Sequence, residues 1–153
     1  MHVGKFKFGK VIDITDPCYN KGSGHKLRVK AKAGTYNCYV SLDDSGCVAS
    51  IQIEHESCSD VGHYKAIGSI GVDSYLAGFF NNKPDYSDDA WNSLLDSIYP
   101  NGALEKSRDW AMGNDGFYSK TGFGNGVYTV YGRMEGDRCV GLEIIFIDDG
   151  NNV

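Results

Sequence analysis

Apolar and polar residues alternate along much of this chain, and a period of two residues is typical of strands that bury one face. The clearest run lies at residues 26–32, where three apolar residues alternate with four cationic ones. Two further alternating segments, residues 36–42 and 48–54, follow after short turns that contain glycine. We therefore expect these three segments to form an antiparallel meander.

Other strands are predicted on both sides of this meander. Near the N-terminus, two phenylalanines alternate with lysines and precede the apolar residues 11–14, which indicates a first strand that is broken near Gly9. The later strands are expected at residues 65–70, 74–80, 127–131 and 139–147. The last two are joined across residues 134–137, a hairpin turn, and apolar residues on both faces of 144–147 indicate a central strand.

Only one segment has a persuasive helical pattern, at residues 87–99. Ser87 can cap its N-terminus, two aspartates follow where the helix dipole favours acids, and apolar residues recur at intervals of three and four. Pro-Asn-Gly at residues 100–102 ends the helix, and residues 103–112 fit either a short helix or an irregular strand. The expected fold class is mainly β, a β-rich α+β arrangement, as an antiparallel sandwich or partly open barrel with one packed helix.

Length and composition favour one soluble globular domain that spans residues 1–153. Apolar residues make up 41% of the chain, and no apolar run reaches the length of a membrane-spanning helix. The N-terminal residues lack the apolar core of a secretory signal, and the five cysteines are an odd number without paired spacing. We therefore expect free thiols, a cytoplasmic location and no membrane association.

Positive and negative charges are separated along the chain. Residues 1–32 contain eight lysine or arginine residues and two acids, whereas the remainder contains seven basic residues and eighteen acids. A formal net charge of −5 does not favour general nucleic-acid binding, which requires a broad positive face. The local strip formed by Lys26, Arg28, Lys30 and Lys32 can still hold a small anion.

Two glycine-containing segments are the most distinctive parts of the sequence. Val-Asp-Ser at residues 72–74 is followed by Ala-Gly-Phe-Phe at 77–80, and Gly-Phe-Gly-Asn-Gly-Val-Tyr at 122–128 precedes a closing apolar strand at 140–146. These motifs resemble the bacterial and phage domain-of-unknown-function family 4241. The resemblance implies a β-rich fold and a cytoplasmic setting, and it supplies no established activity.

A third motif extends the resemblance to the N-terminal half. Asp-Pro-Cys-Tyr at residues 16–19 looks like a tetrapeptide of small phage proteins that have a similar Val-Asp-Ser segment. The chain departs from the family pattern in three ways: Tyr75 stands where glycine is expected, Asn125 stands where aspartate is usual, and no proline follows the second motif. A role of that aspartate as a ligand or catalyst therefore does not transfer to Asn125.

The third motif permits two interpretations. Cys18 could be a reactive thiol, but a neighbouring carboxylate raises rather than lowers a thiol pKa. The alternative, which we favour, is a turn that Asp16 initiates, with Pro17 at its second position and Tyr19 anchored in the core.

The other two motifs also carry polar groups at bends. Asp73 and Ser74 can serve a metal or a polar ligand, or they can satisfy backbone amides, which we favour. Gly124, Asn125 and Gly126 precede a strand rather than a helix, so a hairpin or bulge is favoured over a phosphate-binding loop. The exposed amides of this loop can nevertheless meet an anion.

Metal and hydrolase sites have weaker support. One loop gathers three potential zinc ligands, His55, Cys58 and His63. Their spacing matches no zinc finger, and we favour a solvated polar loop. A hydrolase would require Asp16, Asp73 and His25 to converge, and no serine or cysteine lies in a nucleophile-elbow context. We assign no catalytic residue, metal or cofactor.

The favoured function is that of a non-enzymatic binding or interaction protein, with a phage association implied by the resemblance. It would use glycine-rich loops and an aromatic surface, since the chain holds ten tyrosines and two tryptophans. Its partner would be a protein or a small anionic ligand. The alternative is a nucleotide-binding or nucleotide-sequestering protein, and a hydrolase ranks third. The candidate binding residues are Asp16, Tyr19, Asp73, Ser74, Gly124, Asn125, Gly126, Lys26, Arg28 and Lys30.

Overall fold

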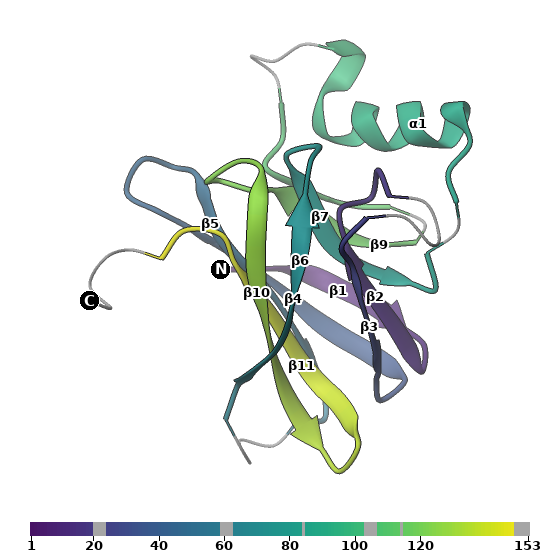
Figure 1. The fold of residues 1–153 in the computed structure, drawn as a ribbon, viewed down its shortest axis with the longest axis vertical. Helices are drawn as coiled ribbons and strands as arrows, with labels where there is room; N and C mark the ends of the chain where they lie inside the picture. The colour runs from purple at the N-terminus through teal and green to yellow at the C-terminus, as the bar shows by residue number, and fades with distance from the viewer. Residues whose placement is uncertain (20–23, 59–62, 84, 103–106, 114, 149–153) are drawn as a thin grey trace.

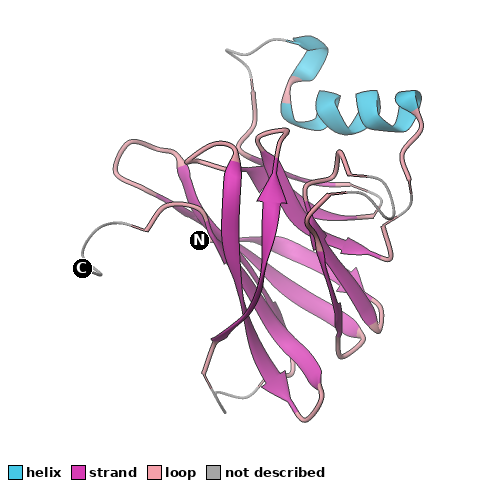
Figure 2. Cartoon of the chain, in the orientation of Figure 1, coloured by secondary structure: helices cyan, strands magenta, loops and turns pink. Residues whose placement is uncertain are grey.

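The computed structural model describes residues 1–19, 24–58, 63–83, 85–102, 107–113 and 115–148. Strands dominate this part of the chain and form two antiparallel sheets that pack face to face (Figure 1, Figure 2). One α-helix and a 3₁₀ turn, η1 (Pro100–Gly102), lie beside them. The predicted mainly β sandwich with one helix is confirmed, and the sheets do not close into a barrel.

The larger sheet contains six strands, and every neighbouring pair is antiparallel. In spatial order they are β1 (His2–Phe8), β4 (Gly34–Leu42), β5 (Val48–His55), β11 (Arg138–Ile145), β10 (Gly126–Glu135) and β6 (Lys65–Val72). β11 lies between β5 and β10, so the predicted central position of this strand is confirmed. A tight turn at Gly136 joins β10 to β11, which confirms the predicted hairpin.

The smaller sheet contains five antiparallel strands. In spatial order they are β3 (Leu27–Lys30), β2 (Val11–Thr15), β7 (Leu76–Asn81), β9 (Gly116–Lys120) and β8 (Trp110–Met112). The pattern does not predict β9, because four of its five residues are buried and nothing alternates. β8 shows that the end of the ambiguous segment 103–112 is a strand, whereas residues 103–106 lie outside the described residues.

Two predicted strand arrangements are wrong. β3 pairs with β2 of the smaller sheet, whereas β4 pairs with β1 and β5 of the larger one, so the three-strand meander does not form. Likewise, β1 and β2 belong to different sheets and are not one strand broken near Gly9. In both places a short bend carries the chain across the sandwich. Alternation determines which face of a strand is buried, but not which strand becomes its neighbour.

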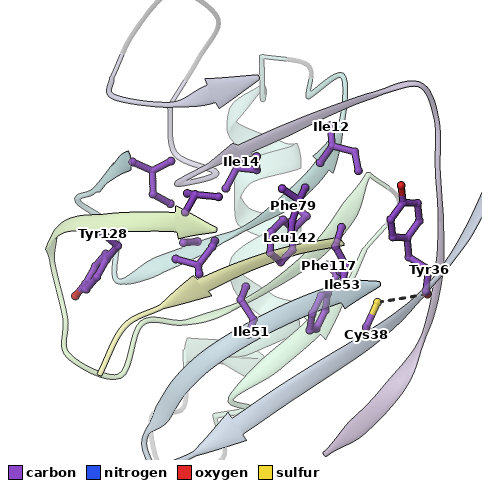
Figure 3. Close-up of a cluster of buried hydrophobic side chains, with 14 of the residues drawn as sticks. Ile12, Ile14, Tyr36, Cys38, Ile51, Ile53, Phe79, Phe117, Tyr128 and Leu142 are labelled. Carbon is purple, nitrogen blue, oxygen red and sulfur yellow. Dashed lines mark hydrogen bonds between the residues drawn. The ribbon is translucent and has the colours of Figure 1, made fainter. Parts of the chain in front are cut away.

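The inner faces of the sheets meet in one large cluster of buried side chains (Figure 3). Ile12 of β2 and Phe79 of β7 come from the smaller sheet, and Ile51 and Ile53 of β5 come from the larger one. Burying a side chain of this size contributes about 1.5–3 kcal/mol. Cys38 lies in this core as predicted, and burial raises the pKa of its thiol to about 12.

A second apolar cluster packs the helix α1 (Asp88–Ile98) against the smaller sheet. Leu94 and Ile98 are buried there with Phe80 of β7, whereas the adjacent Phe79 faces the main core. The hydroxyl of Ser87 accepts a hydrogen bond from a first-turn amide at 3.2 Å, which confirms the predicted cap and helix. No described helix has the length and apolarity needed to cross a bilayer. The cytoplasmic location stays a prediction.

Candidate functional site

The three distinctive motifs meet at one end of the sandwich, which we call the loop end. Residues 16–19 follow β2, residues 73–75 join β6 to β7, and residues 121–125 join β9 to β10. Because β2 and β9 both pair with β7, and β10 pairs with β6, these loops come together although they are far apart in the sequence (Figure 1). The pairing of strands therefore builds the candidate site.

Asp16 is the centre of the loop end. Its buried carboxylate accepts hydrogen bonds from the backbone N–H groups of Cys18 (2.8 Å), Asp73 (2.7 Å) and Ser74 (2.7 Å). The Ser74 hydroxyl donates a fourth bond at 2.5 Å. A carboxylate has about four lone-pair sites, so groups of the protein fill them. Asp16 therefore ties the first motif to the second and leaves no acceptor site for a substrate or metal ion.

Tyr19 supplies a second link between the same motifs. Its hydroxyl donates to Asp73 Oδ2 at 2.5 Å, and burial together with the Asp73 carboxylate raises the pKa of this phenol. Tyr19 is half-buried and is not anchored in the core, which corrects the prediction. A hydrolase would require His25 to converge with Asp16 and Asp73. His25 Nε2 lies 3.1 Å from Ser69 Oγ, and within the described residues no hydrogen bond joins His25 to either aspartate.

Asp73 and Ser74 play a different part from the one predicted. They were expected to satisfy backbone amides at a bend, whereas their own amides donate to Asp16. The Asp73 carboxylate accepts from Tyr19. The bend is therefore held by a side chain from the loop after β2, because a buried acceptor with four sites can serve several amides at once.

Cys18 lies inside the turn that Asp16 initiates. The Tyr19 N–H donates to the Asp16 carbonyl at 3.2 Å and Pro17 is buried, so the geometry agrees with the favoured turn. Burial, followed by the hydrogen bond and charge of Asp16, raises the pKa of the Cys18 thiol from 9.0 to about 12. The thiol is therefore protonated at neutral pH, which opposes a nucleophilic role.

The glycine-rich loop forms a compact turn. The hydroxyl groups of Thr121 and Tyr128 both donate to the Gly124 carbonyl, at 2.7 and 2.6 Å, and the Gly124 N–H donates to the Thr121 carbonyl at 2.7 Å. The φ of Gly124 is 106°, a conformation that favours glycine. The Gly122 N–H donates to the Val48 carbonyl at 3.0 Å. The amides of Gly122 and Gly124 therefore bond to protein carbonyls and do not face an anion.

Asn125 joins the glycine-rich loop to the second motif. Its Oδ1 accepts from the Tyr75 N–H at 2.9 Å, and the Tyr75 carbonyl accepts from the Thr121 N–H at 2.9 Å. Sequence reasoning missed Thr121, which gives no signal beyond its place before a glycine. An aspartate at position 125 would offer the same acceptor oxygen, so the departure from the family pattern preserves this contact.

A groove of about 400 Å³ lies beside the loop end, and we call it the aromatic groove. Its aromatic residues are Tyr75, Tyr99 and Phe123, and Lys120 and Asp109 also line it. Tyr75 and Phe123 are 56% and 74% exposed, so both rings are available to a partner. The Lys120 ammonium lies 5.3 Å from the centre of the Tyr99 ring and 3.8 Å from the Asp109 carboxylate. Exposed rings beside a charged edge are typical of protein recognition surfaces.

Tyr75 has an uncommon backbone conformation for its residue type. Its φ of 62° lies in the left-handed region, which costs an L-residue roughly 1–2 kcal/mol and costs glycine little. The resemblance to family 4241 leads us to expect glycine here, and the geometry explains why glycine would suit. The residue is 56% exposed, so burial of the ring offsets little of this cost. Backbone strain of this kind is concentrated at functional positions of proteins.

The predicted cationic residues lie outside the aromatic groove. Arg28 binds the buried carboxylate of Asp13 through Nε (2.6 Å) and Nη2 (3.0 Å), so its charge is partly neutralised. Lys30 is exposed, and Lys26 is half-buried. The alternating strand is confirmed, although β3 is shorter than the predicted segment.

The loop that contains His55, Cys58 and His63 lies partly outside the described residues, which do not include 59–62. The Ala33 carbonyl lies 3.1 Å from Nε2 of His55, and Nδ1 accepts from the Ser57 N–H at 3.1 Å. Both ring nitrogens of His55 are therefore engaged by the protein. Among the residues that the structure describes, no three histidine, cysteine or acidic side chains gather closely enough to hold a metal ion.

In comparisons with known proteins, no family model matches the chain, and no curated protein or solved structure matches it significantly. The resemblance to family 4241 therefore rests on the three motifs and stays a prediction. The three motifs contact one another at the loop end.

Proposed function

We propose that this protein is a non-enzymatic binding protein that recognises a partner protein through the aromatic groove. One observation carries the proposal: the Tyr75 backbone is held in a left-handed conformation while its ring stays largely exposed. The proposal includes a cytoplasmic setting and a phage association, which rest on the resemblance to family 4241.

The rigidity of the loop end supports recognition by Tyr75 and Phe123. The Tyr75 N–H and carbonyl are both bonded to the glycine-rich loop, and the preceding residue, Ser74, is fixed by Asp16. A preorganised surface loses little conformational entropy when it binds. Aromatic rings provide a large contact area and dominate binding hot spots. We therefore expect the partner to place an apolar side chain between Tyr75 and Phe123.

The chemistry of the loop end favours binding over catalysis. Asp16 accepts four hydrogen bonds, so its oxygens are not available as a general base. The raised pKa of Cys18 keeps the thiol protonated at neutral pH. Neither group is prepared for hydrolysis, which keeps the hydrolase hypothesis third.

Site-specific photo-crosslinking tests the proposal. We would incorporate p-benzoylphenylalanine at position 123, irradiate the protein in a lysate of its native cells, and identify the captured polypeptide by mass spectrometry. The purified partner would then be titrated against variants by calorimetry. Phe123→Ser and Tyr75→Asn should each weaken binding at least about tenfold, because each removes an aromatic anchor. Asparagine tolerates a left-handed backbone, so Tyr75→Asn removes the ring without adding strain.

Met134→Ser is the matched control. Met134 is another exposed apolar residue, but it lies near the opposite end of β10 from the glycine-rich loop (Figure 1). Its substitution should leave the affinity unchanged. Equal affinity of the wild-type protein and both groove variants for the captured partner would reject the aromatic groove as the recognition surface.

A further inference from the structure

A second groove, of about 670 Å³, lies where the chain crosses from β1 to β2, and we call it the basic groove. Three cationic residues line it, Lys7, Lys10 and Arg28, together with Asn81 and Asn82. They come from three separate segments of the chain, so the sequence alone does not place them together. The volume is within the range of small-molecule sites, which is roughly 300–1,000 Å³.

Hydrogen bonds of Asn81 hold the bend that carries the two lysines. The Gly9 N–H donates to Asn81 Oδ1 at 2.8 Å, and Asn81 Nδ2 donates to the Lys7 carbonyl at 2.9 Å. Asn81 itself lies at the end of β7, opposite Ile12 in the neighbouring strand. The sheet therefore fixes the backbone between Lys7 and Lys10, which supports a preorganised site.

Asp13 holds the third cation in place. Its buried carboxylate binds Nε and Nη2 of Arg28, and Nη2 also donates to Asn82 Oδ1 at 3.0 Å. Within the described part of the chain, Nη1 of Arg28 has no hydrogen-bond partner. The guanidinium therefore keeps N–H groups that can bind an anion at the surface, where 55% of its side chain is exposed.

The groove has an excess of positive charge. Asp13 offsets Arg28, whereas Lys7 and Lys10 are exposed and have no side-chain hydrogen bond or ion pair to any described residue. This excess lies on a protein with a net charge of −5, so the basic groove is a local exception. A local site suits a compact anion better than a long polyanion, which would also meet the acidic surface.

We propose that the basic groove binds a small molecule with a diphosphate or triphosphate group. Two lysines provide point charges for phosphate oxygens, and the arginine provides directed N–H groups. The site is separate from the aromatic groove and does not depend on the function proposed for it. It also differs from the anion site predicted by sequence, since it uses Lys7 and Lys10 in place of Lys26 and Lys30.

Titration with sodium pyrophosphate and with ADP tests this site, by calorimetry at low ionic strength on the full chain. We expect saturable binding with a Kd of roughly 10 μM to 1 mM, which weakens as salt is added. Lys7→Gln and Lys10→Gln should each raise the Kd about fivefold or more, and the double variant should abolish binding. Lys65→Gln, an exposed lysine outside the groove, should leave the Kd unchanged.

Several outcomes would overturn the proposal. These are no pyrophosphate or ADP binding at millimolar concentration, equal loss in Lys65→Gln, or equal affinity for citrate. Tighter binding of a single-stranded oligonucleotide than of ADP would indicate a nucleic-acid surface instead. Thermal unfolding would confirm that the lysine variants fold, and Arg28 is left intact because its loss would leave Asp13 buried without its partner. Phe123→Ser should bind pyrophosphate normally, which separates this site from the aromatic groove.

Discussion

The carboxylates of two buried aspartates, which are three residues apart, accept hydrogen bonds from different kinds of donor. Asp13, within β2, accepts two bonds from Arg28 and one from the Lys83 N–H. Asp16, just after β2, accepts from three loop amides and from the Ser74 hydroxyl. The first arrangement holds a cation at the surface, whereas the second joins the loop after β2 to the 73–75 loop and brings no cation to the surface. Asp13 therefore positions Arg28 of the basic groove, whereas Asp16 positions the loop that carries Tyr75 of the aromatic groove.

The largest expected effect comes from Asp16→Ala. The substitution leaves three amide donors and the Ser74 hydroxyl without their acceptor, which should lower the free energy of unfolding by about 3–5 kcal/mol. Asp16→Asn retains one oxygen and should cost less. Urea unfolding monitored by tryptophan fluorescence measures both. Asp44→Ala, at an exposed turn, is the control and should stay within about 0.5 kcal/mol of wild type.

Asp13→Ala should have a smaller effect, about 1–3 kcal/mol, measured by the same urea unfolding. Arg28 is 55% exposed and can turn toward water, so the loss leaves chiefly the Lys83 N–H without an acceptor. The comparison would be refuted if Asp13→Ala were more destabilising than Asp16→Ala. That result would mean that the ion pair of Asp13 with Arg28, and not the hydrogen bonds that Asp16 accepts, dominates the stability of this region.

Tyr75→Gly should change stability little, from no effect to a gain of about 1 kcal/mol. Glycine relieves the left-handed strain, but it loses more conformational entropy on folding, and these terms partly cancel. Binding of the partner should nevertheless be lost, since the ring is gone. Thermal unfolding and partner titration together make the test. A clear loss of stability would show that the ring is a structural element and would remove the main support for the aromatic groove.

The smallest expected effect on stability belongs to the last test, which modifies Cys18 and substitutes no residue. Raising a thiol pKa from 9.0 to about 12 lowers its thiolate fraction at pH 8 roughly 1,000-fold. Iodoacetamide at pH 8, followed by peptide mapping, should therefore label the exposed Cys47 well before Cys18. The rate at Cys18 should increase as the pH rises toward 12. Equal labelling of the two cysteines at pH 8 would contradict the proposed environment of the turn.

Local pattern predicted the elements well where a segment has one buried face or a clear cap. The strands β4 and β5 and the helix after Ser87 follow this rule. Strand β9 escaped prediction because its residues are buried on both faces. The meander failed because β3 and β4 pair with partners that the alternation does not specify.

The candidate residues of the loop end and the turn that Asp16 initiates were predicted from the sequence, but the hydrogen bonds between Asp16 and residues 73 and 74 were not. Asp16, Tyr19, Asp73 and Ser74 do contact one another, and Asn125 contacts the same loop. Asp16 supplies the buried carboxylate, and the amides of Asp73 and Ser74 donate to it. That information is absent from any one motif, because the bonds from Asp73 and Ser74 to Asp16 span 57 and 58 residues.

The sequence by itself determined a β-rich chain with one capped helix, a buried Cys38 and an uneven distribution of charge. These properties depend on side-chain periodicity and composition, which act over a few neighbouring residues. Only the tertiary structure decided that Asp16 would hold the 73–75 loop, that Tyr75 and Phe123 would stay exposed, and that Lys7, Lys10 and Arg28 would line one groove. Strand pairing sets those distances, and it is fixed by how two sheets bury their faces against each other.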